Sequence, residues 1–220
     1  MRIREIRETA IPLKSSLRNA VFDFSEMTTS VVAVITDVIR DGKPVTGFAF
    51  NSTGRYACGA QMRERFIPRL LKAPPESLLN ETGDNLDPEK ILACMMQREK
   101  PGGHSERSVA IGTIEVAVWD AVAKVADKPL HRVLAERYSG GNVPDKVPCY
   151  VGGGNQMTLA IVGGFGLGGC EAYPGVFGVF AGFADDAKVE NGYLELPDRP
   201  GIGFEGQNAL FAVMRELAAR

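Results

Sequence analysis

Residues 108–138 carry the pattern that decides the expected fold, and they read SVAIGTIEVAVWDAVAKVADKPLHRVLAERY. Apolar side chains recur at helical spacing in the first part, at Val109, Ile111, Ile114, Val118, Val122 and Val125. With Trp119 and small alanines between them, they predict a mostly buried helix rather than a strand. Lys128-Pro129 ends this helix because proline lacks an N–H and disfavours helix in the residue before it. We predict a second helix over Leu130 to Arg137, so the pattern alone is typical of a helix hairpin in an α-rich core.

Composition sets broad limits on the class of protein. The 220 residues are 45% hydrophobic and 24% charged, as in ordinary globular chains of one or two domains. The net charge of −2 gives no general attraction to nucleic acid or an anionic membrane, and no apolar run reaches the roughly 18 residues of a membrane span. The charged start lacks a signal-peptide core, and the four cysteines are widely spaced without a C-x-x-C pair. We therefore expect a cytoplasmic protein with reduced thiols and neither nucleic acid nor a membrane as partner.

The chain before residue 140 predicts an α+β arrangement. A first strand is expected over Arg2 to Ile11, and the turn Arg40-Asp41-Gly42-Lys43 joins two further strands as a hairpin. Asp87-Pro88 supplies a good N-cap and first helical residue. The expected strands are 2–11, 29–39 and 45–50, and the expected helices are 59–72, 87–96 and the pair described above. A three-stranded antiparallel sheet followed by a helical bundle is the fold that this order favours.

The chain after residue 140 has a different composition. Of the 25 glycines, 17 lie between Gly140 and Gly206, and Lys188 is the only lysine after Lys146. We expect a strand over Val147 to Val151, a short apolar segment over Met157 to Val162 and a loop-like stretch over 170–184. A small hairpin is expected at 189–196 around Asn191-Gly192, and a last helix at 207–219.

Two patterns give weak functional signals. Gly164, Gly166 and Gly169 satisfy G-x-G-x-x-G and leave a dinucleotide-binding protein as one alternative. That site needs a helix to begin at the glycines, and Pro174 opposes one. The two histidines, His104 and His131, show no metal-ligand spacing, and we interpret His131 as a surface or packing residue.

Several motifs together resemble one family. A-x-W-D-A-x-A-K at 117–124, followed by K-P-L-x-R-x-L from Lys128, is similar to the hinge between capping domain and barrel in the mandelate racemase branch of the enolase superfamily. Within that branch the chain most closely resembles the D-tartrate dehydratases. The further matches are Asn19-Ala20, 27–30, 51–56, 79–88, 100–104, 163–173 and 182–205, over roughly 190 positions.

The resemblance implies an enolase-type capping domain on a (β/α)8-type barrel. Such enzymes remove a proton α to a carboxylate of a small hydroxy acid and expel a β-hydroxyl as water. Mg²⁺ stabilises the enediolate while a Lys or His acts as base. The family's metal ligands are an Asp and two Glu on successive barrel strands, and its bases are a K-x-K motif and a histidine.

The barrel does not fit into this chain. A (β/α)8 barrel takes about 250 residues, but only 74 residues follow Lys146. The sequence passes from the first barrel strand into the segment after the seventh, with the junction near 152–154, and the K-x-K motif, the metal carboxylates and the catalytic histidine are missing. We predict a capping domain over 1–138, residual barrel segments over 139–184 and a tail over 185–220 that returns to the cap.

The resemblance also places some residues near a substrate. Asn19, Arg55 and Tyr56 belong to cap loops that close over the substrate, Lys100 to a further loop, and Glu171 to the end of the last barrel strand. Two hypotheses remain: a family dehydratase, or a catalytically inactive chain that binds no specific Mg²⁺ and acts as a folding or oligomerisation module. We favour inactivity, and we expect residues 147–184, with at most two or three strands, to be poorly packed or to pair in a homo-oligomer.

Overall fold

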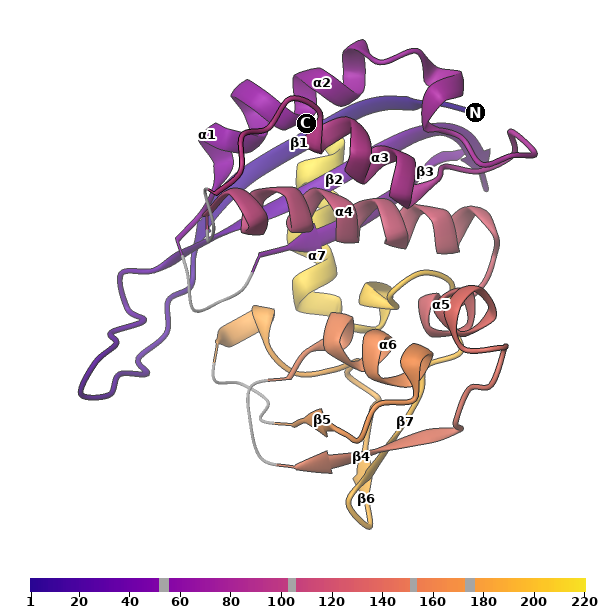
Figure 1. Cartoon of the computed structure of the whole chain (residues 1–220). Coiled ribbons are helices and arrows are strands. Elements are labelled where there is room, and N and C mark those ends of the chain that lie inside the picture. Colours follow the sequence, from indigo (N-terminus) through magenta and orange to yellow (C-terminus); the bar gives the residue numbers. More distant parts are fainter. Residues whose placement is uncertain (52–55, 103–105, 151–153, 173–176) are drawn as a thin grey trace.

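The computed structural model describes residues 1–51, 56–102, 106–150, 154–172 and 177–220 (Figure 1). Its larger part is built on an antiparallel sheet of order β1-β2-β3, with strands Ile3–Pro12, Thr28–Arg40 and Lys43–Phe50. Asp41 and Gly42 turn the β2–β3 hairpin with φ of 50° and 73°. Positive φ at both central residues gives the twist that a two-residue hairpin needs. The predicted α+β class and the predicted hairpin are confirmed.

The middle strand of this sheet is buried on both faces. Residues 30–35 of β2 are all buried, which explains their nearly unbroken apolar sequence. Side chains alternate between the two faces of a strand. Val32 and Val34 therefore pack with the helices on one side, while Val31 and Ala33 pack with the C-terminal helix on the other.

Helices cover the first face. The predicted helix over 59–72 is present as α1 Gly59–Gln61, a π-helical turn Met62–Phe66 and α2 Ile67–Lys72, while η2 Pro75–Leu78 is a 3-10 turn. α3 spans Pro88–Met96, and the carboxylate of Asp87 accepts from the N–H groups of Glu89 and Lys90, as the predicted N-cap should. α4 spans Glu106–Val125 and crosses the sheet, as Figure 1 shows.

The approach of α4 to the sheet depends on Gly47 of β3. A Cβ at this position would overlap with the carbonyl oxygen of Ala117 and the backbone nitrogen of Ala121. The small side chains of α4 and a glycine on the strand therefore allow the two backbones to touch.

The C-terminal helix α7, Asn208–Ala219, covers the opposite face (Figure 1). Leu210, Met214 and Leu217 are buried against this face, on the apolar side expected from the sequence. Arg7 of β1 donates to the carbonyls of Leu217 and Ala218 at 3.2 and 2.7 Å. A cation at the last carbonyls of a helix stabilises its C-terminus. Helix α7 therefore packs on this sheet, and the division of the chain into a cap and a returning tail stays a prediction.

Helix α5 spans Leu130–Tyr138, and the link between α4 and α5 also contacts the tail. The N–H of Leu130 donates to Gly201 at 2.7 Å, and that of Gly201 donates to Lys128 at 2.9 Å. The 3-10 turn η3 spans Gly178–Phe180, and the 3-10 turn η4, Phe204–Gly206, directly precedes α7. The segment after Lys128-Pro129 is therefore held against residues that come more than seventy positions later.

A second, smaller sheet forms from the glycine-rich part. Its order is β5-β4-β7-β6, with strands Cys170–Glu171, Lys146–Tyr150, Tyr193–Glu195 and Val189–Glu190. β4 pairs in parallel with β5 and antiparallel with β7. The hairpin around Asn191-Gly192 is confirmed, with φ of 52° and 77°.

Two features of this part differ from a poorly packed remnant. The apolar segment 157–162, expected as part of the residual barrel segments, lies within helix α6, Gln156–Phe165, and the Asn155 side chain is its N-cap. β4 has a neighbouring strand on each side, β5 and β7. The side chains of Val147, Leu159, Val162, Cys170 and Leu194 form a small core of their own. Among the described helices, none is both long and apolar enough to span a membrane.

Candidate functional site

Asn19 lies in the loop between β1 and β2 and is occupied by its own turn. Its side-chain oxygen accepts from the N–H groups of Val21 and Phe22, each at 2.8 Å. An asparagine that caps a turn in this way shapes the loop. The loop prediction is consistent with this geometry, but the carboxamide oxygen is already engaged.

Tyr56 and Lys100 belong to two other loops, and Arg55 lies outside the described residues. Tyr56 is exposed, and its carbonyl accepts from the Asn51 side chain at 3.1 Å. Lys100 is exposed, and its carbonyl accepts from Arg107 at 2.8 Å. The ammonium of Lys100 and the phenol of Tyr56 are therefore presented on the outside of the molecule.

Glu171 lies in the smaller sheet. It pairs with Tyr150 across the parallel β4–β5 ladder, and its carbonyl lies so close to Gly154 that a Cβ there would overlap it. The described contacts of Asn19, Tyr56, Lys100 and Glu171 lead to different neighbours in different elements. Their place near a substrate stays a prediction.

Next to Lys100, the structure gathers a charge cluster that sequence reasoning missed. The carboxylate of Glu99 has only 1% of its side-chain surface exposed and lies 2.7 Å from Arg65, 2.7 Å from Arg69 and 3.3 Å from Arg107. Burial raises the pKa of Glu99, but the bond from Arg69 and the charges of the arginines outweigh it, so the pKa lies below its ordinary value. Three cations on one carboxylate leave an excess of positive charge. Arg65 and Arg69 are four residues apart in a predicted helix, and this spacing could have predicted that both guanidinium groups lie on one face.

A second buried cluster joins the cap to the tail. Asp120 Oδ2 accepts from the N–H of Phe48 at 2.8 Å and Oδ1 from the N–H of Ile202 at 2.6 Å. Lys124 Nζ lies 2.8 Å from Asp120 and 2.6 Å from Glu205. Burial raises the pKa of Asp120, and Lys124 opposes that shift, while the two carboxylates outweigh desolvation and raise the pKa of Lys124. Asp120 and Lys124 are the polar members of the hinge motif at 117–124, so the sequence did contain this pair.

These clusters do not fit Mg²⁺. A magnesium ion needs carboxylate oxygens and water in octahedral geometry. The carboxylate of Glu99 is engaged by three arginines, and those of Asp120 and Glu205 share one lysine. Within the described ranges, no three side chains of His, Cys, Asp or Glu gather as a metal site. The acids of these two clusters are therefore used in ion pairs and are not free to hold a metal.

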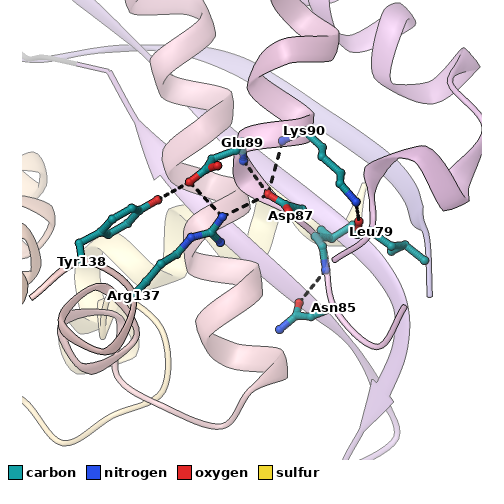
Figure 2. Close-up of polar contacts among 8 residues, drawn as sticks. Leu79, Asn85, Asp87, Glu89, Lys90, Arg137 and Tyr138 are labelled. Atoms are coloured by element: carbon teal, nitrogen blue, oxygen red, sulfur yellow. Dashed lines mark hydrogen bonds and ion pairs between the residues drawn. The ribbon is translucent and has the colours of Figure 1, made fainter. Parts of the chain in front are cut away.

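A third polar cluster joins the start of α3 to the end of α5. Figure 2 shows Arg137 between Asp87 and Glu89, at 3.4 and 3.0 Å, with the hydroxyl of Tyr138 donating to Glu89 at 2.9 Å. The Arg137 guanidinium also lies over Trp119, 5.5 Å from the ring centroid. Desolvation lowers the pKa of Arg137, and its neighbours, Glu89 and Asp87 among them, raise it above the ordinary value. Carboxylates at a helix N-terminus and a stacked guanidinium make this a structural joint.

The glycine motif lies at the end of a helix. Gly164 is in the last turn of α6, and Gly166 ends the helix in the left-handed conformation with φ of 63°. Gly169 comes just before β5. A pyrophosphate needs helix N–H groups, which lie at the other end of α6. The glycines therefore lie at the wrong end of this helix for a dinucleotide site.

The buried histidine is a packing residue, as interpreted from the sequence. His131 is 4% exposed and lies on α5. Burial, together with the charge of Arg132, lowers the pKa of His131 to about 4, with Asp198 opposing the shift. His131 is therefore neutral at physiological pH. His104 lies outside the described residues.

Comparison with known proteins gives a likeness of fold. No family model matches the sequence. Similar solved structures are members of the mandelate racemase and muconate lactonizing enzyme superfamily.

Three of these structures illustrate the extent of the match. A mandelate racemase/muconate lactonizing enzyme from Bordetella bronchiseptica RB50 is 20% identical over 72% of this chain and 38% of its own, with a TM-score of 0.46. The N-succinyl Arg/Lys racemase from Bacillus cereus ATCC 14579 is 19% identical over 69% and 37%, with a TM-score of 0.48. A protein of the same class from Paracoccus denitrificans PD1222, complexed with magnesium, is 19% identical over 68% and 33%, with a TM-score of 0.45. The chain thus spans about a third of the length of these proteins.

Proposed function

We propose that this chain is a non-catalytic relative of the Mg²⁺-dependent hydroxy-acid dehydratases that act on tartrate-like substrates. In this proposal it corresponds to their capping domain closed on its own tail, without the barrel that carries the chemistry. The sequence motifs support the family, in particular the hinge at 117–124 and the loops at Asn19 and Lys100.

One observation carries the proposal. The hinge residue Asp120 receives N–H groups from the cap strand at Phe48 and from the tail at Ile202, and Lys124 adds Glu205 of the tail. Buried polar groups need hydrogen-bond partners, and here residues of the cap and of the tail are partners of one another. This joint supports a cap that is complete without any barrel residue.

The chemistry of the reaction supports inactivity. Removing a weakly acidic α-proton needs a positioned base and a cation on the enediolate. The sequence contains no Lys-x-Lys, and its single lysine after Lys146 is the exposed Lys188. The carboxylates of Glu99, Asp120 and Glu205 are engaged by cations. In this proposal the described residues form a folded support for the cap loops and take no part in proton abstraction.

Two assays test this proposal. The purified chain is titrated with MgCl₂ by calorimetry, and D-tartrate with MgCl₂ is followed for keto-acid product, with an intact family dehydratase as positive control. We expect only heats of dilution and product at the background rate. A saturable site of micromolar affinity, or turnover that falls in Lys100→Ala or Glu171→Gln, would contradict inactivity.

A second candidate function is self-association, and exposed apolar side chains favour it. Ile161, Phe165 and Leu167 at the end of α6 are 41, 41 and 51% exposed, beside the half-exposed ring of Tyr138. Neighbouring exposed apolar groups mark contact surfaces. Sedimentation of the Ile161→Gln, Leu167→Gln double variant should show a smaller species than the parent chain. The Leu71→Gln variant, changed at a 45% exposed leucine of α2, is the matched control and should sediment as the parent chain.

A further inference from the structure

A polar cleft of about 600 Å³ opens in the smaller part of the molecule. It is bounded by β4, by the first turn of α6, and by the chain from Ala184 to Arg199, which includes the β6–β7 hairpin. A volume of this size is in the range of small-molecule sites. All of its lining residues lie in described parts of the chain.

The cleft contains a buried amide without a partner. Gln156 lines the cleft with 1% of its surface exposed, and its side-chain oxygen has no hydrogen-bond partner in the described structure. Its side-chain nitrogen faces Gly203, where even a Cβ would come within 3.1 Å. Leaving a buried polar group unpaired destabilises the folded chain. A methionine would fill the same space without leaving a polar atom unpaired, so the side-chain oxygen of Gln156 needs a donor other than the described residues.

The charges around the cleft are nearly balanced. Three cations and four acids line it: Lys146, Lys188, Arg199, Asp186, Glu190, Glu195 and Asp198. Arg199 pairs with Asp186 at 3.1 Å, and Asp198 with Arg132 at 3.5 Å. Lys188 and Glu190 form no ion pair within the described residues and stand two positions apart on the rim. An excess of one negative charge disfavours a dianion, while both signs remain available to a ligand.

We propose that this cleft binds a small zwitterion, namely a free α-amino acid or a short dipeptide. The ammonium group donates to the side-chain oxygen of Gln156 and lies near Glu190. The carboxylate accepts from Lys188. This inference does not depend on the proposed function, because it uses neither the cap loops nor a metal.

Charge-matched ligands test the proposal. The full chain is titrated by NMR with two zwitterions, L-alanine and L-alanyl-L-alanine. N-acetyl-L-alanine keeps only the carboxylate, L-alaninamide only the ammonium, and D-tartrate is a dianion. We expect saturable shifts at the cleft with at least one zwitterion and affinities about tenfold or more weaker for the other three. The zwitterion that binds with the higher affinity shows whether the cleft prefers a free amino acid or a dipeptide.

Two glutamine variants separate recognition from folding. Gln156→Met should keep or raise the melting temperature and weaken zwitterion binding about tenfold. Gln207 is the matched control, since it is also buried but its amide donates to Ala181 at 2.8 Å. Gln207→Met should lower the melting temperature and leave affinity unchanged. The exposed Lys188→Gln change should weaken binding without affecting folding.

Three results would overturn the proposal. They are no saturable binding of either zwitterion, equal binding of N-acetyl-L-alanine, and unchanged affinity in Gln156→Met.

Discussion

Asp120 Oδ1 accepts a hydrogen bond from the backbone N–H of Ile202 at 2.6 Å, which fixes the tail to the long helix α4. The other oxygen of the same carboxylate holds the N–H of Phe48 in the cap sheet. Gly201 allows this contact, since a Cβ there would overlap with the Asp120 carboxylate. One buried side chain therefore connects a strand, a helix and the tail.

Replacing Asp120 by alanine should destabilise the whole molecule. The change leaves two buried N–H groups and part of the Lys124 charge without partners, and breaking a buried pair in this way costs about 3–5 kcal/mol. Urea unfolding followed by circular dichroism measures it. Asp127→Asn, at an exposed pair with Arg40, is the control and should change stability by less than about 0.5 kcal/mol. A loss for Asp120→Ala no larger than the control's would contradict the joint.

Gly47→Ala and Gly112→Ala should have opposite effects. A methyl at Gly47 meets the α4 backbone, so we expect a loss of about 1–3 kcal/mol. Gly112 lies inside α4 with open space around a Cβ, so alanine there should gain about 0.5–1 kcal/mol. Thermal and urea unfolding of both variants check the signs. Equal effects would show that α4 does not contact β3 at Gly47.

The buried His131 predicts a fall in stability toward acid pH. Its pKa is lowered from 6.5 to about 4 in the folded chain, so below pH 6.5 the unfolded chain binds a proton that the folded chain does not. Stability therefore decreases as pH falls from about 6.5 to about 4, by up to about 3 kcal/mol. Urea midpoints across this range should fall in the parent chain and fall less in His131→Gln. Identical pH profiles would rule out the histidine as the cause.

Deleting residues 205–220 should destabilise the cap, because α7 covers the second face of its sheet. A milder change tests the same packing. Met214 is fully buried, so Met214→Ala should cost about 2–5 kcal/mol, whereas Glu216→Ala on the exposed side should cost little. Melting temperatures of the three chains measure this. If the truncated chain melts at the parent temperature, α7 is not docked in solution.

The cap could be predicted from sequence because its signals are local. Hydrophobic spacing located α4, Asp87-Pro88 located the start of α3, and Asp41-Gly42 located a hairpin. The same signals located α7 and its buried side, including Leu210 and Met214. These elements need no knowledge of distant contacts.

The smaller sheet and the site could not be predicted in the same way. The segment 157–162 is too short and too uniformly apolar to tell a helix from a buried strand by period, and the decisive signal was the N-cap Asn155. Parallel pairing of β4 with the two-residue β5 depends on contacts across the chain. The side-chain oxygen of Gln156 is unpaired because no described donor lies near it, and a sequence pattern does not reveal this.

Amide hydrogen exchange of Phe48 and Ile202 tests the central claim most directly, namely that cap and tail close on one another without a barrel. Both N–H groups donate to Asp120, so in dilute monomer both should exchange only on global unfolding, with the same protection as the middle of β2. Asp120→Asn should lower the protection of both together. Exchange of Ile202 that is orders of magnitude faster than that of Phe48 would show that the tail opens independently, and would contradict the account.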